Sequence, residues 1–289
     1  MLHTPMVTGR TKNKFEVFDS SHLGTPGEDV HLSIEIGLDH VSWSLHKKST
    51  NQLFGVFSYQ HIRAIDVELL SKILDDEKLP EEPATVSFSW RGIPVSFVPT
   101  GLLIDDKLNH FHELGHGSSN EDLIVDEVNA AKLKLLYHPD SNLERCIKNR
   151  FPNAVGYSNT GLVIDNLLRK HSYVKQPQVF LEFASNNTEC YSLMDGRFRL
   201  YNIFPTESSE DILYYLAGIA NHLKTDLQDI RVYFGCDWNN DGTDLKLFKE
   251  YVKQAEINMG YQFVKMSLGM NALKKQRFVS LLNQYACVS

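Results

Sequence analysis

The chain of 289 residues lacks a long apolar stretch and a Lys/Arg-rich run. No segment approaches the roughly 18 apolar residues needed to span a bilayer, which argues against a membrane-spanning helix. No basic run offsets the net charge of −7, and this disfavours a general nucleic-acid binder, which would usually show a basic surface. The polar N-terminus also lacks the apolar core of a signal peptide.

Closely spaced cysteines are absent too. The four cysteines are Cys146, Cys190, Cys236 and Cys287, with no C-x-x-C pair among them. This spacing argues against a disulfide framework and against a thiolate metal site. We therefore expect a reducing compartment, and a cytoplasmic location. Three further patterns are missing: a Gly-rich P-loop, a dinucleotide-binding fingerprint and a G-x-S-x-G nucleophile elbow.

What the sequence does contain is an internal repeat. The stretches HLSIEIGLDHVSWSLHKKSTNQLFGVFSYQ and QVFLEFASNNTECYSLMDGRFRLYNIFP each show three runs of alternating apolar residues separated by turn residues. Such runs predict three antiparallel strands, and the Asp195-Gly196 pair is a strong hairpin signal. When the two stretches are aligned, Glu35 falls on Glu182.

The repeat continues beyond these strands. A helix is predicted at Ile62–Leu74 in the first half and at Ser209–Leu223 in the second. In the first half this helix is followed by the short strand LKLLYH and a helix at Asn142–Arg150. In the second half it is followed by IRVYFG and a helix at Asp244–Ala255. Each half then ends with a strand and a closing helix. Both halves thus have the order β-β-β-α-β-α-β-α, which predicts an α/β protein of two lobes, each a mixed sheet covered by helices.

This pattern divides the chain into three parts. Residues 1–29 are expected to be a loose N-terminal arm, residues 30–173 the first lobe and residues 174–289 the second. The first lobe carries extra sequence at about 83–132, which we interpret as a small inserted α+β subdomain.

The duplicated order is the plan of the actin-like ATPase superfamily, whose lobes have a ribonuclease H-like fold. In LSIEIG, VSFSWRGIPVSFVP and RFRLYNIFPTESSEDILYYL the chain resembles a group of uncharacterised bacterial proteins of this fold. It is more distantly similar to the actin-like proteins of pilus assembly and type II secretion. The resemblance covers nearly the whole chain after the N-terminal arm.

The resemblance also implies a nucleotide site. Members that hydrolyse ATP open each lobe with a hairpin patterned Asp-x-Gly-Thr, whose carboxylate approaches Mg²⁺ and whose glycine lets backbone N–H groups reach phosphate. The matching positions here are Glu35, Gly37, Glu182 and Gly235. Leu38 replaces the hydroxyl residue, Ala184 replaces the second glycine, and Gly235 stands alone where the adenosine loop usually has two glycines. We therefore expect a degenerate site, at which ATP and magnesium bind weakly or not at all.

A second motif lies in the insert. His112, Glu113 and His116 satisfy the zinc-protease pattern H-E-x-x-H on a helix predicted at Leu102–His116. The apolar stripe of that helix leaves both histidines on its flank, and Gly117 reads as its C-cap. The extended pattern would need a histidine at position 122, where the chain has Asp122. We interpret the motif as an exposed, polar helix end and assign no metal site and no catalytic residue.

Three hypotheses remain from different classes. The first, which we favour, is a non-catalytic protein-interaction scaffold with a degenerate nucleotide site and an unknown protein partner. The second is a conformational switch that binds Mg-ATP and has at most weak ATPase activity. The third is a zinc hydrolase that uses His112, Glu113 and His116.

Overall fold

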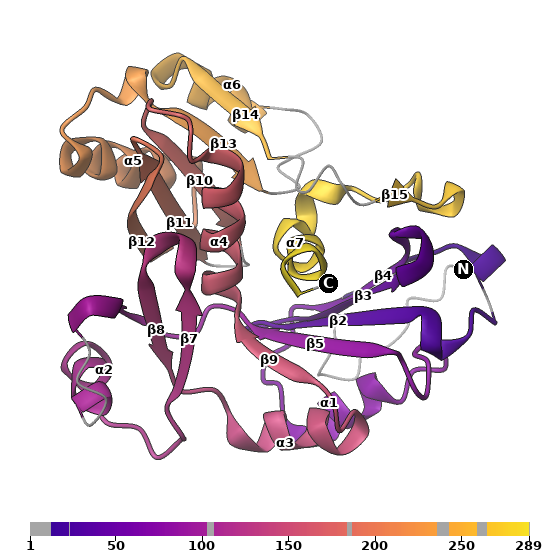
Figure 1. The fold of residues 1–289 in the computed structure, drawn as a ribbon. Coiled ribbons are helices and arrows are strands. Elements are labelled where there is room, and N and C mark those ends of the chain that lie inside the picture. The colour runs from indigo at the N-terminus through magenta and orange to yellow at the C-terminus, as the bar shows by residue number, and fades with distance from the viewer. Residues whose placement is uncertain are drawn as a thin grey trace, which may run out of the picture.

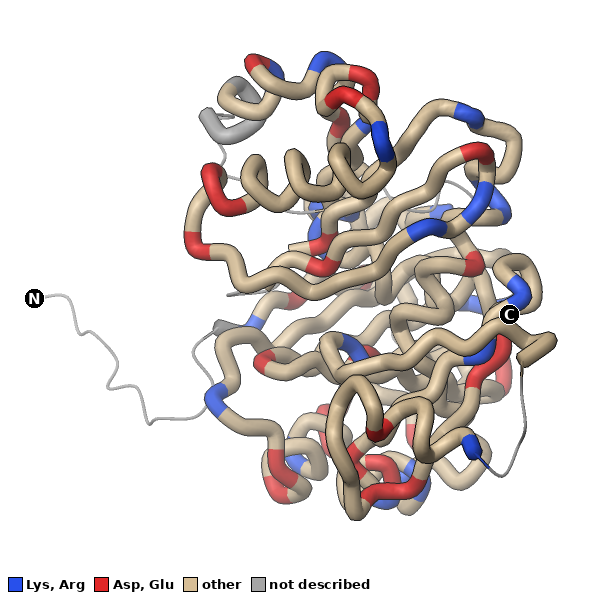
Figure 2. The backbone as a smooth tube through the Cα atoms, turned by 90° about the vertical axis from the view of Figure 1, so that its left-hand side faces the viewer, with Lys and Arg blue, Asp and Glu red and all other residues tan. Residues whose placement is uncertain are grey.

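The structure is a computed structural model that describes residues 13–22, 24–102, 107–183, 187–235, 243–258 and 265–288. Within these residues the chain forms sheets of seven, five and three strands with helices packed on their faces (Figure 1). Acidic and basic residues are interspersed along the backbone (Figure 2). None of the described helices is long and apolar enough to cross a membrane.

The seven-stranded sheet forms the body of the first half. In pairing order its strands are β1 (Asn13–Phe18), β4 (Gln52–Gln60), β3 (Val41–Lys47), β2 (Val30–Ile36), β5 (Thr85–Trp90) and β9 (Val155–Ser158), with β15 (Lys265–Met266) added beside β4. Alternation along β2 places Leu32 and Ile34 on the face that packs with helices α1 (Val67–Leu74) and α3 (Ser141–Arg150). The opposite face of the same strand carries His31, Ser33 and Glu35, all of them buried.

The five-stranded sheet forms the body of the second half. Its pairing order is β12 (Arg197–Pro205), β11 (Asn187–Met194), β10 (Gln178–Phe183), β13 (Arg231–Gly235) and β14 (Gln254–Ile257). Helices α5 (Ser209–Leu223) and α6 (Thr243–Tyr251) cover one face with apolar side chains. Helix α5 begins with a capping box in which Ser208 and Asp211 satisfy each other's backbone N–H groups. The strand order matches that of β4, β3, β2, β5 and β9 in the larger sheet.

The three-stranded sheet and one helix lie between β5 and α3 in the chain. The strands pair in the order β6 (Ser96–Pro99), β8 (Leu133–Tyr137) and β7 (Ile124–Val128). Helix α2 (Leu108–His116) packs against β6 and β8. On the other side, Val128 and Leu135 share an apolar cluster with α4 and with the five-stranded sheet.

Two helices cross between the large sheets. Helix α4 (Asn159–His171) follows β9, yet its Val163 and Leu167 pack against Phe180 of the five-stranded sheet. Helix α7 (Val279–Val288) lies at the C-terminal end of the chain, yet it contacts β2, β3 and β5, and Tyr285 stacks on His46 with ring centroids 4.0 Å apart. The two helices also contact each other (Figure 1). Each closing helix therefore covers the sheet of the other half.

Three sequence expectations are wrong in their details. Residues 13–18 of the expected loose arm form strand β1, which pairs with β4. The strand TVSFSW was expected in the insert but is β5, parallel to β2 in the large sheet, whereas LKLLY is β8 at the centre of the small sheet. In the second half, helix α6 ends at Tyr251, and QAEI forms β14 of the five-stranded sheet. Of the strand expected at YQFVKM, residues 261–264 lie outside the described residues, and Lys265–Met266 pair with β4 as β15.

Candidate functional site

The candidate site lies where strands of both large sheets end. Glu35 is the second-last residue of β2, and Glu182 is the second-last residue of β10. Both residues are 3% exposed. In open α/β sheets this carboxyl edge is where ligands bind. The structure therefore brings together the two carboxylates that the repeat aligned, one from each half of the chain.

A buried arginine holds these carboxylates together. Arg91 follows β5 and is 7% exposed. Its guanidinium nitrogens lie 3.6 Å from Glu35 Oε1, 3.5 Å from Glu182 Oε2 and 3.4 Å from Glu189 Oε1. Glu189, on β11, is 2% exposed and accepts a hydrogen bond of 2.9 Å from the Tyr191 hydroxyl. We call Arg91 and these three glutamates the Arg91 network.

Glu35 receives further donors from both crossing helices. Asn159 Nδ2, at the start of α4, donates to Glu35 Oε2 over 3.0 Å, and the Ser280 hydroxyl, in the first turn of α7, donates to the same oxygen. His40 Nε2 lies 3.1 Å from Glu35 Oε1. Helix N-termini attract negative charge, so the ends of α4 and α7 stabilise this carboxylate in its ionised form.

The ionisation states follow from these contacts. Burial raises the pKa of Glu35, but the hydrogen bond from His40 and the charge of Arg91 outweigh it and bring the pKa to about 2. Burial lowers the pKa of His40, yet its hydrogen bonds to Asp39 and Glu35 raise the pKa overall. For Glu182, burial dominates over the attraction of Arg91 and raises the pKa to about 8. A proton on Glu182 therefore reduces the excess of negative charge around a single guanidinium.

The two glycines of the predicted nucleotide site are already in close contact with side chains. The Gly37 N–H donates to the His40 carbonyl over 2.9 Å, and a Cβ at Gly37 would lie 2.0 Å from the His40 ring. Gly235 pairs with Glu182 across β13 and β10, and a Cβ there would lie 3.4 Å from Glu182 Cγ. Gly37 thus leaves room for the His40 ring, whereas a Cβ at Gly235 would come nearest to the backbone oxygen of Leu181, at 3.3 Å.

This arrangement does not fit a magnesium nucleotide. The Arg91 guanidinium already supplies the positive charge between the carboxylates, and a divalent cation beside it would be repelled. The His40 ring covers the turn at Gly37, where a phosphate would need access to backbone N–H groups. Chemically, the site is a buried ion network in which one guanidinium contacts three carboxyl groups.

Sequence reasoning missed Arg91 and Glu189. Arg91 looks like an ordinary surface cation after a strand, because its partners lie far away in the chain. Glu189 lies within the apolar alternation of β11, and a charged side chain at such a position usually requires a buried partner. That signal was available, although it does not identify the partner.

The H-E-x-x-H motif has a different environment. His112 is buried, and its Nδ1 lies 3.1 Å from Ser96 Oγ on β6. His116 Nε2 lies 3.2 Å from the Val95 carbonyl, whereas Glu113 is exposed and pairs with His110. Within the described residues, no three potential ligands are arranged to hold a metal ion. The expectation of an exposed helix end is wrong for His112, which anchors α2 to the small sheet.

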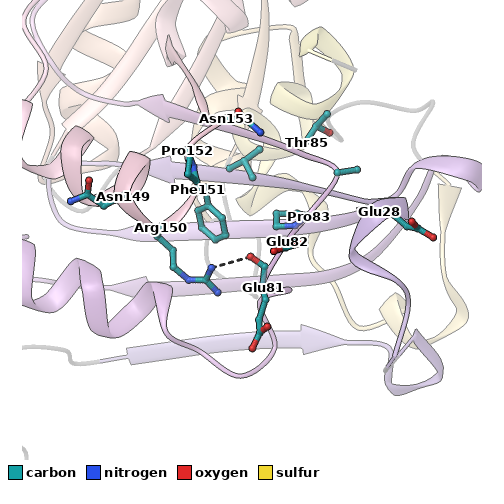
Figure 3. A pocket seen from close by; sticks show the side chains of 12 residues that line it. Glu28, Glu81, Glu82, Pro83, Thr85, Asn149, Arg150, Phe151, Pro152 and Asn153 are labelled. Carbon is teal, nitrogen blue, oxygen red and sulfur yellow. Dashed lines mark hydrogen bonds between the residues drawn. The ribbon is translucent and has the colours of Figure 1, made fainter.

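One cavity lies away from the Arg91 network. Its volume is about 800 Å³, and it is lined by Thr85 and Val86 at the start of β5, whereas Arg91 follows the end of that strand. In this cavity Arg150 donates to the Glu81 carbonyl over 3.0 Å (Figure 3). Its lining mixes polar side chains with apolar ones such as Val86 and Phe151, and none belongs to the site that the repeat predicted.

Comparison with known proteins identifies the family. The sequence profile of DUF3822, a family described as proteins of unknown function, matches residues 25–255. The chain belongs to the DUF3822 family. No curated protein sequence matches this member of the family.

Solved structures show its fold. A Bacteroides thetaiotaomicron protein with an actin-like ATPase fold and unknown function superimposes with a TM-score of 0.72 and 14% identity, over 89% of this chain and 96% of that one. The PilM–PilN type IV pilus biogenesis complex matches with a TM-score of 0.60 and 8% identity, over 90% of this chain and 98% of the matched chain. This DUF3822 chain therefore has an actin-like ATPase fold, and the resemblance seen in the sequence is confirmed.

The Arg91 network makes a stability prediction. Replacing Arg91 by methionine leaves three buried carboxyl groups without their cation, and breaking a buried ion network in this way costs about 3–5 kcal/mol. We expect urea denaturation to show a loss of this size in the free energy of unfolding. The control is Arg63→Met at an exposed cation, which should change it by less than about 0.5 kcal/mol. Equal stability of the two variants would contradict the central role of Arg91.

The raised pKa of Glu182 makes a second prediction. Between pH 4.5 and about pH 8, the folded chain keeps a proton on Glu182 that the unfolded chain has already released. The stability contributed by this group is therefore full below pH 4.5 and is lost as the pH rises through 8. Glutamine at this position is neutral at every pH. The free energy of unfolding of Glu182→Gln, relative to wild type, should therefore increase across this interval in denaturation curves. Parallel pH profiles would refute the assignment, and exposed Glu207→Gln is the control.

The H-E-x-x-H motif in α2 makes a third prediction about stability. Because His112 is buried and hydrogen-bonded, we expect His112→Ala to lower the free energy of unfolding by about 1–3 kcal/mol, whereas Glu113→Gln should alter it by less than about 0.5 kcal/mol. A chelator should leave the melting temperature of the wild type unchanged. Stoichiometric zinc in purified protein, with a lower melting temperature after its removal, would reverse this interpretation.

Proposed function

We propose that this DUF3822 protein is a non-catalytic protein-interaction scaffold, in which the Arg91 network takes the place of a bound nucleotide. The observation that carries the proposal is the guanidinium of Arg91 between Glu35, Glu182 and Glu189. In this scheme the positive charge that closes the two halves belongs to the chain itself and does not arrive with a ligand.

We further infer that the two halves are tandem ribonuclease H-like lobes. The shared strand order of the two large sheets supports this inference, as does the reciprocal packing of α4 and α7. On this view the small sheet and α2 form the insert of the first lobe, between Trp90 and Ser141. The C-terminal segment from Lys265 onward packs with the first lobe through β15 and α7.

The geometry of the site argues against phosphoryl transfer. That reaction depends on positioned cations and donors that stabilise charge on the transferred phosphoryl group. Here the buried cation is committed to three carboxyl groups, and the Gly37 N–H is committed to the His40 carbonyl. An Mg-ATP switch would have to break the Arg91 network before it could bind its ligand.

An interaction role is consistent with the fold. The PilM–PilN neighbour is a protein that shares this fold and works in a complex, and the insert of the present chain offers additional surface for a partner. The described cysteines are free thiols, and we place the protein in the reducing cytoplasm as part of the same proposal.

Calorimetry tests the proposal directly. Titration of metal-stripped protein with Mg-ATP should give no binding heat at millimolar nucleotide, because the Arg91 guanidinium lies between the carboxyl groups and the His40 ring covers the turn at Gly37. Glu35→Ala should behave in the same way. Micromolar binding by the wild type that is lost in Glu35→Ala would instead identify an ATP-dependent switch.

A further inference from the structure

A groove of about 770 Å³ lies between the insert and the edge of the second lobe. One wall comes from the end of β6 and the start of β8, and the other comes from β12, the edge strand of the five-stranded sheet. Aromatic side chains meet across it, since the Phe97 ring centroid lies 5.5 Å from Phe198 and 5.8 Å from Tyr201. The groove is therefore built by two parts of the fold that are distant in sequence.

The groove is positively charged in an acidic protein. Lys132, Arg197 and Arg199 line it, and no Asp or Glu is among its described lining residues. Arg199 pairs with exposed Asp195 at 3.6 Å, whereas no ion pair of Lys132 or Arg197 occurs with a described residue. The whole chain has a net charge of −7, so this local excess of cations favours an anionic ligand.

A second, apolar hollow adjoins the groove. Its volume is about 360 Å³, and it lies between β12 and α5, lined by Phe204, Tyr214, Tyr215 and Gly218 among others. Leu200 lines both hollows, so they meet at the edge strand. A ligand that fills both must supply negative charge at one end and an apolar side chain at the other, and it must be long enough to pass over β12.

The edge strand itself limits how such a ligand binds. Strand β12 has a register shift near Leu200, ends at Pro205, and carries an Ile203 N–H that donates to the side chain of Asn202. Bulges, proline and charge are features that prevent a further strand from pairing along an edge. Recognition through side chains in the two hollows is therefore favoured over extension of the sheet.

We propose that these two hollows bind an acidic segment of a partner protein, with carboxylates at Lys132, Arg197 and Arg199 and an aromatic or branched apolar side chain in the hollow beside Gly218. The proposal rests on the interaction role proposed above and names the surface and the chemistry of the partner. The acidic balance of the chain and the confined groove favour a peptide over a nucleic acid, which would need a more extended basic surface.

Selection from a library of random dodecapeptides displayed on phage tests this inference. With the full-length protein as bait, the enriched peptides should combine Asp or Glu with an aromatic or branched apolar residue. A synthetic, fluorescein-labelled copy of an enriched peptide then serves as the probe in anisotropy titrations. Its binding should weaken as salt is raised, because the contacts with the exposed cations are screened.

Two matched pairs of variants locate the binding surface. Lys132→Glu with Arg197→Glu should weaken binding at least about tenfold, whereas Arg63→Glu with Lys253→Glu, the same charge change at exposed residues elsewhere, should not. Gly218→Leu should fill the apolar hollow and weaken binding. Gly115→Leu, in α2, is its control, because a Cβ at either glycine has no atom within 4 Å.

Several outcomes would overturn the proposal. Failure to enrich any peptide, enrichment of peptides without acidic residues, or binding that survives both groove variants would each remove the groove as the site. Binding of labelled oligo(dT) that is lost in the Lys132→Glu/Arg197→Glu variant would assign the groove to single-stranded nucleic acid. Self-association lost in the same variant would assign it to a second copy of the chain. Mg-ATP binding, by contrast, would overturn the scaffold role and would leave the result for the groove intact.

Discussion

The contact between Arg91 and the three buried glutamates joins the two halves of this protein where their sheets end. Glu35 and Arg91 come from the first half, and Glu182 and Glu189 come from the second. Without the guanidinium, like charges would face each other in a buried space, and the halves would separate or the carboxyl groups would take up protons. A buried network of this kind contributes little net stability relative to apolar packing, but a shift of one member would leave a buried charge without its partner. We therefore expect its main effect to be on the relative orientation of the halves.

The crossing helices reinforce that orientation by two different means. Helix α4 packs on the five-stranded sheet through apolar and aromatic side chains such as Leu167 and Phe180. Part of the α7 interface with the larger sheet is polar instead: Gln284 bridges Ser87 and Ser89 with hydrogen bonds of 2.8 Å. Non-directional apolar burial tolerates small shifts, whereas hydrogen bonds to fixed partners do not. The hydrogen bonds of α7 therefore fix the position of this helix on the larger sheet more specifically than apolar packing would, and they do so directly beside Glu35.

The sequence predicted local structure well and long-range pairing poorly. Helix α5 was predicted with its observed bounds because helical periodicity is a local signal. The strands TVSFSW and LKLLY were exchanged between the large sheet and the insert, since both are short apolar runs and their sheet membership depends on distant partners. For the same reason Glu35 and Glu182 could be aligned through the repeat, whereas Arg91 could not be assigned to them. The motif at His112 showed the converse error, because a local pattern matched while the fold turned the histidine toward Ser96 and the small sheet.

Because the cation between the carboxyl groups is Arg91, a residue of the chain, its effect on closure of the two halves does not depend on a bound nucleotide. A ligand shifts an equilibrium between open and closed lobes only to the extent that it binds one state better than the other. Arg91 is covalently part of the chain, so its contribution to the closed state is the same at every nucleotide concentration. The insert is also tied to the second half by a shared apolar cluster that includes Val128, Leu135 and Phe180, which opposes opening at a second place. On the scaffold proposal, a protein held closed at these two points does not report a nucleotide through its cleft. Its specificity then depends on the outer surfaces that the closed form brings together, of which the groove between β12 and the insert is one.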